Sequence, residues 1–369
     1  MLELELLRDG SRQLEICNAC RYCEGLCAVF PALERRSFFA EGDITYLASL
    51  CHDCRACFDA CPYAPPHEFA VDIPSLMSTV RERTHAHYAW PRWLAERADR
   101  RLGFALALSG ASVALVLAAT VLGGGVDRLF AVHRGPGSFY EVVPWIAMML
   151  PFMVVSLFVV AVLLMAGIRY WRDTSGSIAT GPLREFGSLA RTVLDAATLR
   201  YLRGGGPGCT YPSQRPSHGR AILHSLVFYG FVAAFISTTL AAVYQDVFGI
   251  LPPYPLLSAP VLFGSVGGAA MIVGCIGLLW LKERADSART DGRMQTMDVA
   301  FIAVLLLVNL SGFVLLALRE TAAMGLALDL HLGLTAGLFV TLPYGKFAHS
   351  VYRSLAILRH RGESVRDHT

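Results

Sequence analysis

The segment CNACRYCEGLC, residues 17–27, places four cysteines within eleven residues, and CHDCRACFDACP, residues 51–62, repeats the arrangement. Both follow the spacing C-x2-C-x2-C-x3-C. Three thiols at successive two-residue gaps suit three corners of an iron–sulfur cubane, whereas zinc sites usually pair two C-x2-C units across a longer gap. The doubled spacing therefore predicts two [4Fe-4S] clusters rather than zinc sites or structural thiols.

The fourth cysteine of each run is expected to belong to the opposite cluster. In two-cluster ferredoxins of this spacing, that cysteine binds the cluster held by the other run. Pro62 directly follows the second run, as in the ferredoxin pattern, while the first run reaches a proline only at Pro31. The predicted ligand sets are Cys17, Cys20 and Cys23 with Cys61, and Cys51, Cys54 and Cys57 with Cys27.

The rest of the chain has the composition of a membrane protein. Of its 369 residues, 54% are hydrophobic, which is more than a soluble domain usually carries. Its uncharged stretches reach the length of about 20 residues that crosses a bilayer. We expect six spans, near residues 102–123, 143–168, 221–247, 256–281, 298–318 and 326–352. The predicted fold class is all-α, with an N-terminal ferredoxin-like domain followed by a six-helix transmembrane bundle.

The distribution of basic residues predicts the orientation. Arginine and lysine concentrate in residues 169–220, 282–293 and 353–366, whereas the alternate loops carry few. The positive-inside rule places these segments and both termini in the cytoplasm. The acidic start of the chain lacks the apolar core of a secretory signal, so we expect the cysteines to lie in a reducing compartment.

This organisation divides the chain into four parts. They are the cluster domain at residues 1–80, a connector along the membrane surface at 81–101, the membrane domain at 102–352 and a cytoplasmic tail at 353–369. Within the membrane domain, the cytoplasmic segment 169–220 contains an amphipathic stretch that is expected to lie on the membrane surface. It ends in the loop GGGPGCTYPSQRPSHGR, where Cys209 is expected to be a free thiol without partners.

Three histidines lie within the predicted spans. Ionisable residues are costly in lipid and usually mark function. His224 is near the cytoplasmic start of the third span, and His331 and His349 are 18 residues apart on the sixth. Eighteen residues make five turns of an α-helix, so the two histidines of the sixth span share one face and lie about 27 Å apart along its axis. His349 is therefore near the cytoplasmic surface, at the depth of His224, as two axial ligands of one haem b require. The alternative is that each histidine only hydrogen-bonds a neighbouring helix.

Other polar residues lie near the expected haem. Arg220, His218 and Lys346 are candidates for binding haem propionates or a quinone headgroup, and the alternative is that they anchor the helices in the lipid headgroups. His331 has no second histidine opposite it on the third span. We therefore expect one haem, with His331 serving structure or a quinol site.

Several motifs together resemble a known family. The two cysteine runs, GGGPGCTYP, RAILHSLVFYGF and LPYGKFAHSVYR resemble the tricarballylate (citrate) utilization protein B family over nearly the whole chain. The resemblance implies a multi-pass iron–sulfur protein of the bacterial inner (cytoplasmic) membrane. It would reoxidise the reduced flavin of a cytoplasmic FAD-dependent dehydrogenase and pass electrons to the respiratory chain. A fused relative implies an alternative role, serving a cobalamin-biosynthetic flavin monooxygenase.

The last predicted helix is similar to that of the cytochrome b subunit of respiratory nitrate reductase. Pro343, Lys346 and His349 recur there in matching places. In that subunit, histidines with the spacing of His331 and His349 bind two haems. The resemblance implies a haem-ligand role for His349 and extends it to His331, with His224 as the partner on the cytoplasmic side.

The predicted function is that of an electron-transfer subunit of an oxidoreductase, which reduces quinone together with its flavoprotein. GGGPG does not join a strand to a helix, so flavin is expected on the partner. No acid–base constellation is present, so no catalytic residue is predicted and the cofactors carry the chemistry. The rivals are a tricarboxylate transporter, which needs broken helices in repeated halves, and a redox sensor or anchor without turnover. Membrane lipid is an expected partner, and nucleic acid is not.

Overall fold

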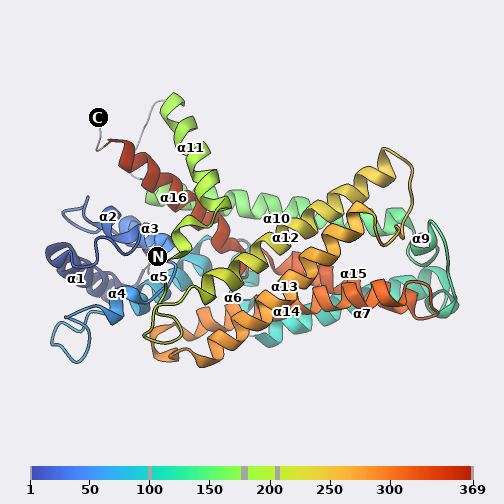
Figure 1. The fold of residues 1–369 in the computed structure, drawn as a ribbon, viewed down its shortest axis with the longest axis horizontal. Helices are drawn as coiled ribbons and strands as arrows, with labels where there is room; N and C mark the ends of the chain where they lie inside the picture. Colours follow the sequence, from blue (N-terminus) through green and yellow to red (C-terminus); the bar gives the residue numbers. More distant parts are fainter. Residues whose placement is uncertain (1, 99–101, 176–181, 204–207, 367–369) are drawn as a thin grey trace.

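The computed structural model describes residues 2–98, 102–175, 182–203 and 208–366, and the regular elements in these ranges are helices, apart from one isolated bridge between Cys209 and Ser217. Short helices gather at one end of the molecule, and long apolar helices run from them toward the other end (Figure 1). The predicted all-α class with six long apolar helices is confirmed.

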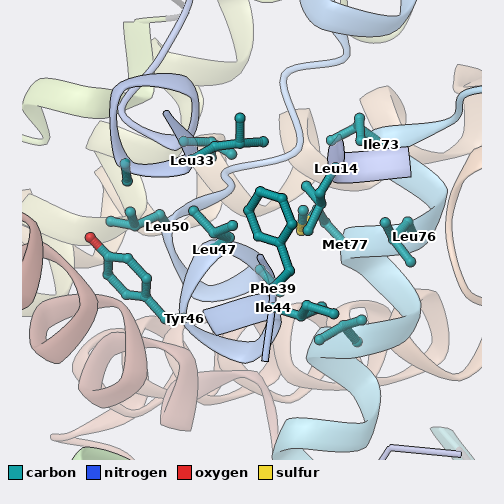
Figure 2. Close-up of a cluster of buried hydrophobic side chains, with 14 of the residues drawn as sticks. Leu14, Leu33, Phe39, Ile44, Tyr46, Leu47, Leu50, Ile73, Leu76 and Met77 are labelled. Atoms are coloured by element: carbon teal, nitrogen blue, oxygen red, sulfur yellow. The ribbon is translucent and has the colours of Figure 1, made fainter. Parts of the chain in front are cut away.

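The cluster domain has its own hydrophobic core (Figure 2). Its helices are α1 (Leu4–Cys20), α2 (Val29–Leu33), α3 (Glu41–Leu50), α4 (Ala56–Asp59) and α5 (Ile73–Tyr88). α5 begins at Asp72, whose side chain accepts the backbone N–H of Ser75, with Pro74 in the first turn. Leu14, Leu47 and Met77 are fully buried and join α1, α3 and α5 in one core.

Among the residues that the structure describes, six helices are long and apolar enough to cross a membrane. They are α7 (Leu102–Gly124), α10 (Trp145–Thr174), α12 (Gly219–Asp246), α13 (Ala259–Arg284), α14 (Gly292–Leu318) and α15 (Met324–Thr341). The first five agree closely with the predicted spans. α7 and α15 approach each other through glycine, because a Cβ at Gly337 would lie 2.7 Å from Ser109 Cα.

The sixth span is shorter than predicted. α15 ends at Thr341, the chain turns through residues 342–345, and the short 3-10 helix η3 (Lys346–Ala348) leads into α16 (His349–Arg366). Pro343 has no N–H to donate to an α-helical hydrogen bond, and its ring obstructs the preceding turn. His331 and His349 therefore lie on different helices, and the prediction that one helix carries both is wrong.

α16 is a helix that returns to the cluster domain rather than a free tail. Its Ala356 and Ile357 are part of the cluster-domain core. α5 crosses the expected boundary at residue 80, and His85, expected at the membrane surface, is buried edge-on against Tyr352 of α16.

The remaining elements are α6 (Arg92–Ala98), α8 (Asp127–Phe130), α9 (Ser138–Val142), α11 (Pro182–Ala197), η1 (Arg200–Arg203) and η2 (Ser287–Arg289), with α11 packed beside α16 (Figure 1).

Candidate redox site

The first cysteine cavity is lined by Cys17, Cys20, Cys23 and Cys61. α1 carries Cys17 and Cys20 at its end, where Arg21 adopts a left-handed conformation with φ 54° and turns the chain into the loop of Cys23. Cys61 follows shortly after α4. The aromatic side chains that border the cavity are those of Tyr22, Phe30, Phe58 and Tyr63.

The second cysteine cavity adjoins the first and is lined by Cys27, Cys51, Cys54 and Cys57. Cys57 borders both cavities. The fourth cysteine of each run thus lies with the first three of the other run, the grouping that the ferredoxin spacing predicts. Whether these side chains bind iron stays a prediction.

The chemistry of the cysteines in the two cavities favours clusters over single metal ions. Burial, followed by the neighbouring thiols, raises the pKa of Cys17 to about 12 and that of Cys23 to about 11. Thiolates crowded in this way require a bound cation to compensate their charge. Within the described ranges, no three Cys, His, Asp or Glu side chains are close enough to share one metal ion. A cubane takes each thiolate at a separate corner and so fits a wider arrangement than zinc does.

Cys209 is a free thiol, as predicted, but it is not without partners. The loop before α12 folds onto the second cavity, where the backbone N–H of Thr210 donates to Cys54 O at 3.0 Å. The Cys209 side chain is 1% exposed, donates to Leu202 O at 3.6 Å and packs in the same buried cluster as Cys54, and its interaction with Cys54 lowers the pKa of Cys209 to about 7. The described part of this loop, from Gly208, is therefore held against the second cysteine run at Cys54. The position of Cys209 in the sequence, far from both cysteine runs, does not indicate this contact.

Three arginines from three helices converge beside the second cavity. We call Arg81 of α5, Arg220 of α12 and Arg353 of α16 the arginine layer. Arg81 donates hydrogen bonds of 3.3 and 3.1 Å, Arg353 donates one of 3.1 Å, and Arg220 donates a further one. The acceptors are the backbone carbonyls of Ala48, Leu50, Cys51 and Asp53. The sequence indicates only Arg220 of these three, because an arginine that faces lipid and one that faces a cofactor have the same local pattern in a basic segment.

His224 and His349 lie side by side. Their ring centroids are 6.4 Å apart and the ring planes are at 89°. His349 Nδ1 contacts Lys346 O, which leaves the other ring nitrogen available, and His224 Nδ1 is buried without a hydrogen-bond partner in the described structure. Two ring nitrogens that each bind one metal at about 2 Å place the centroids roughly 6 Å apart. The pair therefore fits axial ligation of a single haem.

Two other predicted site residues are engaged elsewhere. Lys346 Nζ lies 2.7 Å from the carboxylate of Asp298, which also pairs with Lys282 at 2.5 Å. His331 Nδ1 lies 3.0 Å from Ser311 Oγ across the contact between α14 and α15. The cofactor-binding roles suggested for Lys346 and His331 stay predictions, and these contacts give each side chain a structural role of its own.

Comparison with known proteins matches both parts of the chain. Residues 97–369 match the family described as citrate utilization protein B, and residues 10–87 match its Fer4-like domain, which includes all eight cysteines of the two cavities. The chain is 43% identical to the citrate utilization protein B of Escherichia coli over 359 residues, covering 95% of this chain and 91% of the relative. No solved structure matches the chain.

Proposed function

Because this chain belongs to the citrate utilization protein B family, we propose that it carries electrons from citrate or tricarballylate oxidation into a membrane. The donor is the reduced flavin of a cytoplasmic FAD-dependent dehydrogenase, and the acceptor is quinone in the bacterial inner membrane. The cofactors are two [4Fe-4S] clusters and one haem b, which supply one-electron transfer. Both chain termini and the cluster domain lie on the cytoplasmic side.

This proposal rests on three candidate metal sites that adjoin one another in the fold, namely the two cysteine cavities and the histidine pair. Cys57 borders both cysteine cavities, so the two cluster positions adjoin. Arg220, which holds the second cavity's loop at Asp53, is one helical turn from His224 on α12. Arg353, which also contacts that loop, is one turn from His349 on α16. The histidine pair therefore lies next to the second cavity.

The side chains of this chain prepare the sites for electron transfer rather than for bond chemistry. The thiols of each cavity come from both cysteine runs, so each cluster ties the two runs together. The contact between His349 Nδ1 and Lys346 O fixes the orientation of the imidazole and directs its other nitrogen away from η3. α12, one of the six long apolar helices, and α16, which returns to the cluster domain, hold the histidine pair where the membrane domain meets the cluster domain.

A reduced-minus-oxidised absorbance spectrum of the full-length protein in detergent, with iron and haem assays, is the direct test. We expect about eight non-haem irons per chain and a b-type haem signal. His349→Ala and His224→Ala should lose the haem signal, and the matched control His331→Ala should keep it. Full iron content without haem would contradict the histidine assignment, and a purified chain that holds no iron would contradict the proposal as a whole.

An electron-transfer assay separates a conduit from a redox sensor. The reduced flavoprotein dehydrogenase is supplied as donor and a soluble quinone analogue as acceptor. We expect quinone reduction that requires this protein and that is lost in Cys51→Ser. Cluster reduction that is not followed by quinone reduction would support the sensor instead.

A further inference from the structure

The arginine layer concentrates three positive charges, and the main carboxylate acting on it is that of Asp53, beside Arg220. Within the described ranges, every hydrogen bond of these three guanidinium groups goes to a backbone carbonyl, and none of the three forms an ion pair. Burial, together with the nearby positive charges of Arg81 and Arg220, lowers the pKa of Arg353 to about 10. The fold therefore holds three like charges close together, an arrangement that costs free energy unless a negative charge lies nearby.

Two buried arginines away from the cysteine cavities are neutralised by carboxylates. Arg36 and Arg359 are both almost fully buried, and both pair with Asp43 and Glu363 at distances between 2.6 and 2.9 Å. The protein thus supplies carboxylates for its buried arginines where no cofactor is expected. Beside the second cavity, the groups nearest to Arg353 that counter its charge are the thiols of Cys51 and Cys27.

We propose that the arginine layer provides the counter-charges of the cluster held by Cys27, Cys51, Cys54 and Cys57, and makes it the more easily reduced of the two. This inference rests on the proposed function only in that both clusters are present. A cluster with four thiolate ligands is anionic, and its reduction adds one further negative charge. Nearby cations stabilise the reduced form more than the oxidised form, which raises the reduction potential.

The first cavity differs from the second. Arg289 lies over the ring of Phe58, which lines the first cavity, and this arginine is paired with Asp286 at 2.9 Å. Tyr22, in the loop of the first cavity, is 70% exposed. The first cluster is therefore the one that a soluble electron donor reaches, and the second is the one that faces the histidine pair.

The electron transfer is balanced within the pair of clusters. The reduced flavin of the partner dehydrogenase gives one electron at a time to the first cluster. The first cluster is oxidised by one electron when the second is reduced by one, with no proton or bond change required. A more positive potential at the second cluster makes this transfer favourable in the direction of the membrane.

The test is a redox titration of the full-length protein in detergent, followed by electron paramagnetic resonance. Arg353→Met removes the charge and keeps an apolar stem of similar length, whereas Arg353→Lys keeps the charge. The matched control is Arg21→Met, because Arg21 is an exposed arginine in the loop of the first cavity. Iron content verifies that each variant holds both clusters, and Cys20→Ser identifies the signal of the first cluster.

We expect Arg353→Met to lower the midpoint potential of the more positive cluster and to leave the other unchanged. The midpoint potential of that cluster in Arg353→Lys should be closer to its value in the unmodified protein. Arg21→Met should leave the midpoint potential of the more positive cluster unchanged. If Arg353→Met fails to retain iron, Arg220→Met is the second variant and the same shift is expected.

Three results would overturn the inference. They are an unchanged potential in iron-replete Arg353→Met or Arg220→Met, an equal shift of both clusters, and assignment of the more positive signal to the first cluster. The potentials are measured without a flavoprotein or quinone, so failure here is distinct from failure of the proposed electron route.

Discussion

Glu363 is the carboxylate that joins α16 to the cluster domain, and its replacement should loosen this contact strongly. Its side chain accepts from Arg36 at 2.6 Å and from Arg359 at 2.9 Å, and Tyr46 Oη donates to it at 3.1 Å. The Glu363 side chain is 7% exposed. Removing one partner of such a buried pair costs about 3–5 kcal/mol because a charge is left uncompensated. Asp43 still pairs with both arginines, so we expect a cost of about 3 kcal/mol for Glu363→Gln.

Hydrogen exchange measures this cost directly, because the amides of α3 and α16 exchange when the two helices separate. A loss of about 3 kcal/mol corresponds to roughly 100-fold faster exchange. The matched control is Asp9→Asn, which breaks the exposed pair between Asp9 and Arg12 and should change exchange only a few-fold. Acceleration of less than about tenfold in Glu363→Gln, or no more than in the control, would refute the reasoning.

Three further perturbations test separate parts of the structure. Gly337→Ala should lower the thermal midpoint in detergent, because overpacking the contact of α7 with α15 costs about 1–3 kcal/mol; Gly110→Ala, where a Cβ meets nothing within 4 Å, should not. Cys51→Ser should reduce non-haem iron from about eight to about four per chain, whereas Cys275→Ser should keep all of it. Burial lowers the pKa of His360 to about 4 in the folded protein. As the pH drops below about 6.5, the His360 imidazole is therefore protonated in the unfolded chain before it is protonated in the folded one. This difference lowers the free energy of unfolding by about 2 kcal/mol at pH 5. His360→Phe should therefore lose less thermal stability between pH 8 and pH 5, and an unchanged loss would contradict this origin.

Local spacing and hydropathy predict much of this protein. The six spans follow from uncharged stretches of sufficient length, which depend only on the sequence within each helix. The cysteine grouping follows from the C-x2-C-x2-C-x3-C spacing, because a cubane sets the geometry of its own ligands. The pairing of His224 with His349 was predicted from their common depth in the membrane. That pairing is present even though the helix expected to carry His349 is interrupted at residues 342–345.

Contacts between distant segments were beyond the reach of the sequence. The contact of Cys209 with Cys54 joins a loop in the middle of the chain to a cysteine run near its beginning. Neither segment contains a pattern that indicates the other. Arg81 and Arg353 belong to basic segments in which any arginine has the same local environment. Lys346 was considered for cofactor binding, whereas its actual partner, Asp298, lies on a different helix and matches it only in space.

The return of α16 to the cluster domain has a consequence for how the protein is made. Ala356 and Ile357 complete a core whose other members all belong to the beginning of the chain. The ribosome releases those early segments first and must still synthesise the membrane domain before the missing helix exists. The eight thiols therefore wait in an unfinished domain during membrane insertion. Under the proposed function, the clusters would be inserted after completion of the chain or into a domain that is still open.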